Sequence, residues 1–498
     1  PLLAACGGSA AGPGSGSAGG GASRLTVALP GMMIESLNPY AHSTGQLYPT
    51  WKHIGQPLVE WDWKQKVLAP VLAESWGAAD KNTWVFKLKQ GVKFNDGSDF
   101  TSADVVHSYT RMKTDQDSKQ GSTLAGVDSM DAPDPYTVKL HTKQPDGPFV
   151  FRLTQRSIFS KAAYDKLGAV EADKKAVGTG PYRLKEWVAG QRFVVEKNPN
   201  YSLDVQKPTV DEVVFRNIPE AEAAITALLN GEVDQISNVP SESASRLTGT
   251  VRAASARDIT ILFLGMHAGL VPQFADKRVR QAVSYAIDRE AIVQGVLKGD
   301  GYALDAPIGP DQYGYSQDIQ PKYSHDPAKA KQLLAAAGYP NGFSVDLQVF
   351  LDQYPKIKDI GQVLAQQLAA VGIKTNLLTP DQTSGVNAIE AGKAGFYTNG
   401  RGSVVDPSEY LLQYFRTGVT KRLGYSNPEV DKALDAQAAE FDVSKRLPLL
   451  TTVMSMLMDE APVAWLFQYK GIAGVSNRFD YTPNPDEYVY AWDFRLRG

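Results

Sequence analysis

The sequence predicts an α/β protein of two or three domains, with mixed β-sheets flanked by helices. Three observations support this prediction. The chain of 498 residues is longer than one hydrophobic core usually supports. Segments with the period-2 alternation of half-buried strands are interleaved with segments that carry the apolar stripe of amphipathic helices. The composition, 43% apolar and 21% charged, is that of a globular protein.

In the first part of the chain, a strand, a turn and a capped helix follow one another within residues 72–112. Residues 84–88 alternate between large apolar and polar side chains, and residues 92–94 are expected to form a second short strand. Thr101 is expected to cap a helix, because Asp104 stands in its first turn. Further alternation predicts strands at residues 24–29, 59–63 and 136–141.

The middle of the chain is punctuated by turn residues. The glycines of residues 178–182 (GTGPY) are interpreted as turn residues that lead into a strand, with residues 192–197 as its hairpin partner. Residues 213–215 are expected to form a strand. The predicted helices are residues 220–229 and a long amphipathic helix or helix pair at residues 276–298.

The last third shows a strand, helix, strand pattern at residues 345–350, 356–371 and 373–378, which favours a parallel pair with a right-handed crossover. Before it, Pro327 follows the capping residue Asp326, an arrangement typical of a helix start. Two further helices are predicted, one that begins at Asn427 and one at residues 445–460. Strands are expected at residues 463–467 and 488–495.

Catalytic and metal-binding motifs are missing from the sequence. No two of the six histidines are spaced by three or four residues, and there is one cysteine, so a dedicated zinc site has no support. Neither a GxSxG elbow nor a phosphate-binding loop is present. The net charge of -3 does not point to nucleic acid. We therefore expect no enzyme, no cofactor and no metal.

The N-terminal residues 1–23 have their own character. Cys6 follows Leu3, Ala4 and Ala5, which resembles a bacterial lipobox at the end of a secretory signal. Residues 7–23 are all Gly, Ala, Ser or Pro, a composition that cannot fold and suits a flexible tether. Cys6 is thus expected to carry a lipid, the alternative being a stray terminal thiol.

Several blocks resemble the family 5 extracellular solute-binding proteins, the peptide, nickel and opine receptors of ATP-driven importers. They are LAESW at residues 72–76, TWVFKLKQGVKFNDG at 83–97, TSADVVHSY at 101–109, GTGPY at 178–182 with KNPNY at 197–201, and residues 276–298. The resemblance implies the type II (cluster C) periplasmic-binding-protein fold, with two large lobes, an extra domain and a ligand cleft between the lobes. It also implies an extracytoplasmic monomer that delivers its solute to a permease in the cytoplasmic membrane.

Domain limits follow from the same resemblance. Domain I is expected to be discontinuous, at residues 24–56, 180–262 and 475–498. Domain II is expected at residues 57–179 and domain III at residues 263–474.

The ligand anchors of the peptide-binding members are not matched. Where those members carry an acidic residue before an Asp-Pro step, here Asp406-Pro407, this chain has Ser403 or Val404. The loop at residues 350–355 lacks their arginine, and a nickel receptor's histidines are missing. We expect Arg401, with Asn399 and Ser403, to face a polar or anionic ligand such as a modified peptide, an opine or a sugar conjugate. The alternative is an internal ion pair of Arg401, for instance with Asp406.

Further cleft candidates lie in loops and strands near the expected lobe crossings, where each aromatic could equally belong to the core. They are Met33, Ile34, Tyr48, Trp51, Gln353, Tyr354, Tyr397, Trp465 and Phe467. Two other functions stay open at this point, an extracytoplasmic hydrolase and a chemosensory or chaperone-like receptor.

Overall fold

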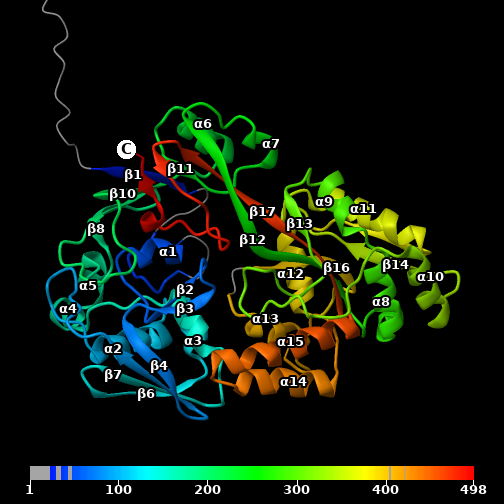
Figure 1. Ribbon diagram of the computed structural model, residues 1–498, viewed down its shortest axis with the longest axis horizontal. Helices are drawn as coiled ribbons and strands as arrows, with labels where there is room; N and C mark the ends of the chain where they lie inside the picture. Colours follow the sequence, from blue (N-terminus) through cyan, green and yellow to red (C-terminus); the bar gives the residue numbers. More distant parts are fainter. Residues whose placement is uncertain (1–22, 30–34, 43–46, 403–404, 420, 498) are drawn as a thin grey trace, which may run out of the picture.

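The computed structural model describes residues 23–29, 35–42, 47–402, 405–419 and 421–497. Two lobes lie side by side and are joined by β12 (Val251–Met266) and β17 (Val463–Ser476), which cross from one lobe to the other (Figure 1). The first lobe contains both the N-terminal strand and the C-terminal segment. The second lobe contains the helices between residues 277 and 460, coloured from green to orange in Figure 1.

One sheet runs through both lobes in the order β15, β14, β16, β12, β17, β11, β1, β10, β9, β8, with β13 paired to β17. Parallel pairs join β1 to β10 and β11, and β14 to β15 and β16. The carboxyl ends of β1 and β11, and those of β14 and β16, therefore each share an edge of the sheet. The strands are β1 Arg24–Leu29, β8 Tyr182–Val188, β9 Arg192–Lys197, β10 Glu212–Asn217, β11 Gln235–Ile236, β13 Gly301–Ala303, β14 Phe343–Gln348, β15 Ile373–Leu378 and β16 Phe396–Arg401.

A smaller unit is built on the four-stranded sheet β4, β5, β7, β6 (Ala73–Asp80, Thr83–Leu88, Thr137–Thr142, Val127–Asp134) and the ribbon β2, β3 (Val59–Asp62, Val67–Pro70). Its helix α2 (Ser102–Thr114) begins at the predicted cap, where the Asp104 carboxylate accepts a hydrogen bond from the Thr101 backbone N at 2.8 Å. The other helices of this half are α1 Leu47–Lys52, α3 Phe149–Arg152, α4 Lys161–Leu167 and α5 Ala169–Lys175.

Of the helices in the remaining chain, α6 and α7 belong to the first lobe and the others to the second lobe (Figure 1). They are α6 Ala221–Leu229, α7 Ser241–Ala244, α8 Lys277–Ala286, α9 Arg289–Gly295, α10 Pro327–Ala336, α11 Ile357–Ala370, α12 Gln382–Glu390, α13 Ser408–Phe415, α14 Pro428–Ala439 and α15 Val443–Glu460. Residues 276–298 thus form the helix pair that was one of the two predicted possibilities.

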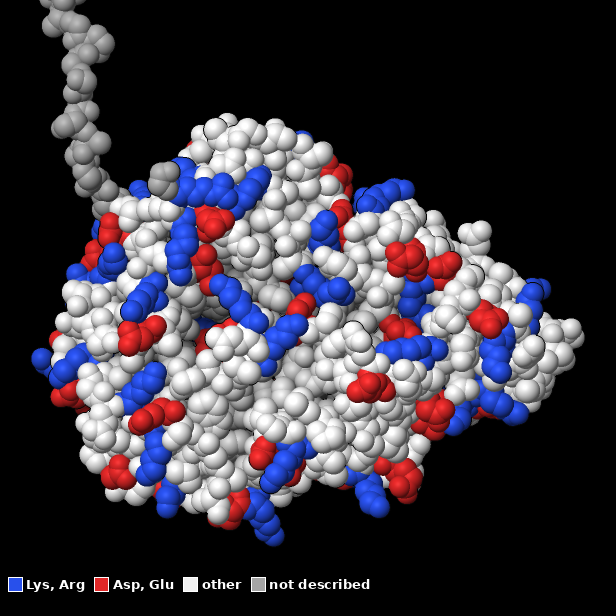
Figure 2. All heavy atoms as spheres, in the orientation of Figure 1, with Lys and Arg blue, Asp and Glu red and all other residues white. Residues whose placement is uncertain are grey.

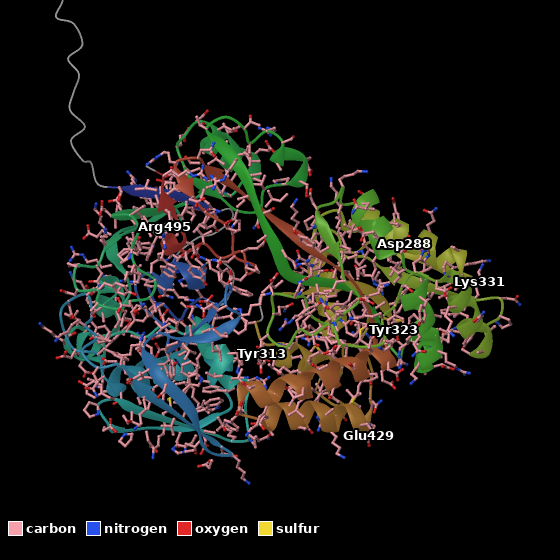
Figure 3. The ribbon with its side chains drawn as sticks, viewed as in Figure 1. Asp288, Tyr313, Tyr323, Lys331, Glu429 and Arg495 are labelled. Atoms are coloured by element: carbon pink, nitrogen blue, oxygen red, sulfur yellow. The ribbon has the colours of Figure 1, made fainter. Side chains whose placement is uncertain are left out.

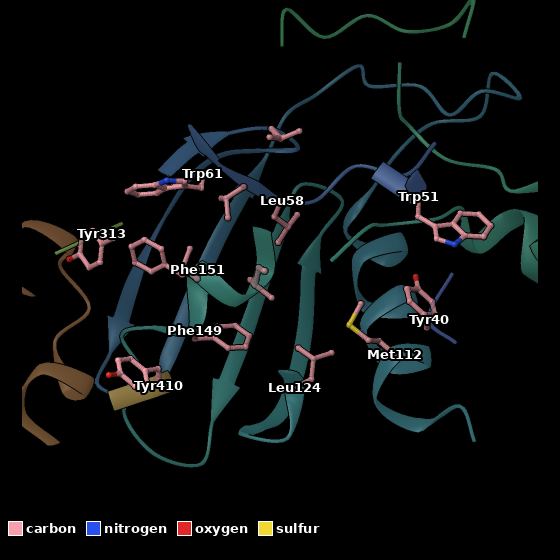
Figure 4. Close-up of a cluster of buried hydrophobic side chains, with 14 of the residues drawn as sticks. Tyr40, Trp51, Leu58, Trp61, Met112, Leu124, Phe149, Phe151, Tyr313 and Tyr410 are labelled. Carbon is pink, nitrogen blue, oxygen red and sulfur yellow. The ribbon is translucent and has the colours of Figure 1, made fainter. Parts of the chain in front are cut away.

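Aromatic side chains join the small unit to the second lobe (Figure 4). The ring of Phe151 lies 6.0 Å from that of Trp61 and 4.6 Å from that of Tyr313, measured between centroids. Tyr313 lies between the small unit and α15 (Figure 3), where its hydroxyl donates to the carbonyl of Val443. This buried seam fixes the small unit against α15.

Two predicted strands are absent from the described residues. Residues 92–94 make only an isolated bridge, between Lys93 and Asp99. Residues 488–495 are mostly an irregular segment, because their aromatic rings are buried by stacking and not by strand pairing. Tyr490 and Trp492, for example, stack at 4.9 Å, and only Arg495–Leu496 forms a strand (β19), paired with Phe479–Asp480 (β18).

The glycines of residues 178–182 have a different role from the predicted one. A Cβ on Gly178 would lie 2.1 Å from the Ile54 carbonyl oxygen, and one on Gly180 would lie 2.3 Å from that of His53. The Gly180 backbone N donates to the Ile54 oxygen at 2.6 Å. These glycines are therefore required for close backbone approach.

A buried carboxyl group links the small unit to the C-terminal segment of the first lobe. Asp486 accepts hydrogen bonds from Trp63 Nε1 at 3.1 Å and from the Tyr488 backbone N at 3.0 Å. Burial raises the pKa of Asp486 to about 7. The folded protein therefore binds a proton at Asp486 that the unfolded chain releases above about pH 4.

Because of this proton, the free energy of unfolding is expected to fall as the pH rises from about 4 to 7, by up to about 1.4 kcal/mol per pH unit for this group. Asp486→Asn should remove that part of the slope, as measured by urea unfolding at several pH values. Asp480→Asn, which changes a carboxylate that is 71% exposed, is the control. An unchanged slope in Asp486→Asn would show that Asp486 ionises normally.

Candidate ligand cleft

A cavity of about 1090 Å³ lies between the two lobes, where β12 and β17 cross. The first lobe contributes the loop that follows β11, at residues 238–242. The second lobe contributes the end of α9 with residues 296–300, the loop after β14 from Tyr354 to Lys356, and the first turns of α11. Crevices at the carboxyl ends of parallel strands are the usual ligand sites of open α/β sheets.

Two stacked tyrosines form one wall. The rings of Tyr354 and Tyr469 are 6.2 Å apart and inclined by 17°. The Tyr469 hydroxyl donates to the Pro355 carbonyl at 3.0 Å. Burial raises the pKa of both phenols well above the physiological range. The wall therefore offers flat aromatic faces and a neutral hydroxyl.

Basic side chains on the wall already have partners. Lys356 Nζ lies 3.6 Å from Glu242 of the opposite lobe, and Lys470 Nζ lies 3.3 Å from Asp300. Lys298 Nζ donates to the Gly295 carbonyl at 2.7 Å. Side chains of both signs thus lie at the junction of the lobes (Figure 2).

Two carboxyl groups that sequence analysis missed also line the cavity, Asp258 and Glu487. Asp258 lies on β12 at the point where its pairing with β17 is irregular, between Arg257 and Ile261. Glu487 comes from the turn before the last aromatic segment. Burial, and then the charge of Asp258, raises the pKa of Glu487 to about 8. Burial also raises the pKa of Asp258.

The end of β16 adjoins this cavity. A Cβ on Gly400 would lie 2.6 Å from the Tyr354 hydroxyl oxygen, and one on Gly402 would lie 2.1 Å from Thr260 Oγ1. Asn399 Oδ1 accepts from Gln353 Nε2 at 3.0 Å. The predicted residues Gln353, Tyr354 and Asn399 are therefore brought together at the edge where β14 and β16 end.

Arg401 lies at the same edge with a 30% exposed side chain. Its Nη2 lies 3.3 Å from Gln413 Oε1 and 3.8 Å from the carboxylate of Glu409. Its buried Nε has no hydrogen-bond partner among the described residues. Arg401 thus keeps hydrogen-bonding capacity, because its one ion pair is long.

The suggested internal pair of Arg401 with Asp406 is wrong. The Asp406 carboxylate is held by Arg446 of α15, whose Nη1 and Nη2 lie 2.6 and 3.1 Å from its two oxygens. Arg446 also donates to Ser408 Oγ at 2.6 Å and to the Gln437 carbonyl at 3.1 Å. The side chain of Arg446 is fully buried, so this network anchors the Asp406-Pro407 step to α14 and α15.

Comparison with known proteins decides the family. The sequence profile of bacterial extracellular solute-binding proteins, family 5 (middle region), matches residues 67–422. The chain belongs to this family. A glutathione-binding protein GsiB of Pectobacterium atrosepticum is 30% identical over 463 residues, which cover 90% of this chain and 88% of the relative.

Solved protein structures share the fold. HbpA2 of Haemophilus parasuis superposes with a TM-score of 0.85 at 23% identity, covering 95% of this chain and 100% of that one. AgaA of A. tumefaciens R10, solved with agropinic acid, gives a TM-score of 0.72 at 25% identity, covering 95% and 99%. The predicted two-lobed type II architecture is confirmed. This family 5 protein is an extracytoplasmic substrate-binding component of an ABC importer, which delivers its solute to a permease.

Four predicted cleft aromatics of this family 5 protein are core residues in the structure. Trp51, Tyr397, Trp465 and Phe467 are at most 2% exposed. Trp465 Nε1 donates to the Tyr410 hydroxyl at 2.9 Å, and the Tyr397 hydroxyl donates to the Arg422 carbonyl at 3.0 Å. The polar groups of Trp465 and Tyr397 are thus satisfied within the protein, whereas the buried Trp51 Nε1 has no hydrogen-bond partner among the described residues. Of the other candidates, Cys6, Met33, Ile34, Ser403 and the side chain of Tyr48 lie outside the described residues.

Neither a membrane-spanning helix nor a metal-ligand cluster is found in the part of the chain that the structure describes. No helix there has the length and apolar content to cross a bilayer. No group of three or more His, Cys, Asp or Glu side chains is placed to hold a metal ion.

Proposed function

We propose that this receptor captures a short peptide-like zwitterion, of the size and charge of glutathione, in the cavity between its lobes. The observation that carries the proposal is the presence of both carboxyl and basic groups around one interlobe cavity. A zwitterionic ligand carries groups of both signs and can complement both. The relationship to a glutathione-binding protein over 90% of the chain supports the same ligand class.

Arg401 is proposed to bind a carboxylate of the ligand. Its guanidinium can donate two parallel hydrogen bonds to a carboxylate, and the unpaired Nε is available for one of them. Asn399 and Gln353 are proposed to bind ligand amides, because Gln353 Oε1 has no partner among the described residues. Tyr354 lines the cavity, and its hydroxyl adjoins Gly400 of β16, next to Asn399 and Arg401. Met33, Ile34 and Ser403 remain proposed ligand contacts on the basis of the sequence.

Arg401→Ala is expected to weaken glutathione binding by about 10- to 100-fold, because a charge-assisted bidentate contact contributes about 1.5–3 kcal/mol. Isothermal titration calorimetry of both proteins measures the change. Arg416→Ala is the matched control, since Arg416 lies at the end of α13 and pairs with Asp435 at 2.9 Å. If Arg401→Ala binds glutathione as tightly as the wild-type protein, Arg401 does not contact the ligand and serves only its ion pair with Glu409.

An opine is the second candidate ligand, supported by the likeness to the agropinic acid complex of AgaA. Titration with an opine and with glutathione under the same conditions separates the two. In either case the proposed action is capture without a covalent step, in which contacts with both lobes favour the closed state. A sensor on the same scaffold would instead bind a membrane receptor, and a hydrolase would convert the ligand into a product.

The remaining features of the receptor are proposed from sequence. Cys6 is proposed to carry the lipid that holds a monomeric receptor at the membrane, with residues 7–23 as its tether. Domain I is proposed to comprise residues 24–56, 180–262 and 475–498, with domain II at 57–179 and domain III at 263–474. The location of β1, β8–β11 and the C-terminal segment in one lobe supports the discontinuous domain (Figure 1).

A further inference from the structure

We infer that the small unit acts as a latch, in which residues 146–151 hold the second lobe against the first. The inference rests on the proposed function, because the cleft that the latch closes is the proposed place of ligand capture. It assigns a task to the small unit, which comprises β2–β7 and α2–α5 and none of whose described residues lines the cavity between the lobes.

The small unit is firmly joined to the first lobe. Gly178 and Gly180 approach the backbone of residues 53–54 so closely that a Cβ has no space. The fully buried Lys52 of the first lobe forms an ion pair with Glu60 of β2. Separating this pair would leave a buried charge without its partner. The small unit and the first lobe should therefore move as one body.

On its other side, the small unit docks on the loop between α14 and α15 of the second lobe. The Gly147 backbone N donates to the Ala438 carbonyl at 2.7 Å. Ala438 lies in the last turn of α14, where carbonyl groups lack a partner within the helix. A Cβ on Gly147 would lie 1.9 Å from the Glu440 carbonyl oxygen, so only glycine leaves room for this approach.

Aromatic rings extend the contact beside Gly147. Phe441 of the second lobe packs on Trp84 of β5, with the ring centroids 4.8 Å apart. Trp84 is 1% exposed, and its Nε1 donates to the Asp146 carbonyl at 3.0 Å, which ties it to the loop that carries Gly147. The seam of Phe151 and Tyr313 continues the same interface. Burial of these rings favours contact between the small unit and the second lobe.

A polar contact lies at the turn of the β2–β3 ribbon. Lys66 Nζ donates to the Pro310 carbonyl at 2.8 Å and lies 3.1 Å from the Asp311 carboxylate. The Lys66 side chain is 47% exposed, so solvent weakens this ion pair. We therefore expect the aromatic rings to contribute most of the holding free energy.

The latch lies away from the strands that join the lobes. In Figure 1, β12 and β17 cross above the centre, whereas α3 adjoins α15 below. The pairing of the crossing strands is irregular between Arg257 and Ile261, a suitable joint for rotation. Such a rotation would part residues 146–151 from residues 438–441. The polar groups separated at Gly147 belong to the backbone and can bond to water, so the latch can open reversibly.

The latch should determine how long a captured ligand stays bound. Ligand contacts and latch contacts both favour the closed arrangement, so each adds to its population. If the latch is weakened, the open state is more populated, and the ligand leaves faster through it. Residues distant from the cavity wall would thus control the rate of release.

Phe441→Ala tests the inference, because it removes the ring that covers Trp84 and leaves the cavity wall unchanged. Small-angle X-ray scattering of the ligand-free protein should give a larger radius of gyration than for the wild type. Hydrogen exchange of residues 146–151 should become about tenfold faster. Stopped-flow measurement should show glutathione dissociating about tenfold faster.

Two further variants separate latch opening from a general loss of stability. Phe343→Ala removes another half-buried ring of the second lobe, which packs on Tyr339 at 5.5 Å, and should alter neither the radius of gyration nor the exchange of residues 146–151. Gly147→Ala should open the protein as Phe441→Ala does, because its methyl group meets Glu440. Circular dichroism and the melting temperature check that each variant is folded.

A wild-type radius of gyration in both Phe441→Ala and Gly147→Ala overturns the inference, as does equal opening in Phe343→Ala. Scattering and exchange are measured without ligand, so this result leaves the proposed function standing if the wild-type protein binds glutathione. Conversely, a wild-type protein that binds no glutathione, with variants that open as expected, contradicts the proposed function and supports the latch.

Discussion

Replacing Asp406 by asparagine is expected to lower the free energy of unfolding by about 3–5 kcal/mol, because it leaves a fully buried guanidinium without its counter-charge. Arg446 has no route to solvent, and its other partners, Ser408 and Gln437, are neutral. The same change should weaken ligand binding, since Asp406 anchors the end of the segment that follows Arg401. Urea unfolding measures the stability.

Two further variants isolate the cause. Asp435→Asn breaks the ion pair between Asp435, which is 56% exposed, and Arg416. This change should lower the free energy of unfolding by no more than about 1 kcal/mol. Adding Arg446→Met to Asp406→Asn removes the unpaired charge and should recover part of the loss. A loss in Asp406→Asn as small as that in Asp435→Asn would contradict the buried network.

Gly180→Ala is expected to destabilise the protein by about 3 kcal/mol or more, because the added methyl group has no space. It would lie 2.3 Å from the His53 carbonyl oxygen and 2.7 Å from two backbone carbons of His53 and Ile54. Backbone atoms cannot rotate away as a side chain can, so the loop at residues 53–55 must move. The melting temperature and urea unfolding report the effect.

Gly77→Ala is the matched control for this substitution. A Cβ on Gly77 meets no atom within 4 Å, and Gly77 lies in a strand, where alanine is tolerated. Its stability should change by less than about 1 kcal/mol. Equal stability of the two variants would refute the close-approach role of Gly180 and restore the interpretation as a simple turn residue.

Local signals in the sequence predicted much of the fold. The cap at Thr101, the βαβ unit of β14, α11 and β15, and the Asp326-Pro327 helix start all depend on neighbouring residues, and each is present. By contrast, β12 was missed. Its first half, Val251–Asp258, contains Ala, Ser, Arg and Asp, which have little strand propensity, and it is held in place by pairing with β17 more than 200 residues later.

The site shows the same division. Asn399, Arg401 and Tyr354 were predicted because they lie near blocks with a recognisable family pattern. Asp258 and Glu487 carry no local signal, since each is one acid among 54 and their proximity is created by the crossing of the lobes. The only available hint was an acidic pair, Asp486-Glu487, directly before an aromatic segment, and that segment was misread as a strand.

Native mass spectrometry of the protein incubated with reduced glutathione tests the central proposal most directly. A receptor that captures a peptide-like zwitterion between its lobes predicts a single saturable adduct of one intact glutathione per chain, which is recovered unchanged after denaturation. Absence of any adduct at millimolar ligand would contradict the proposed ligand class, and cleaved or modified glutathione would contradict capture without a covalent step.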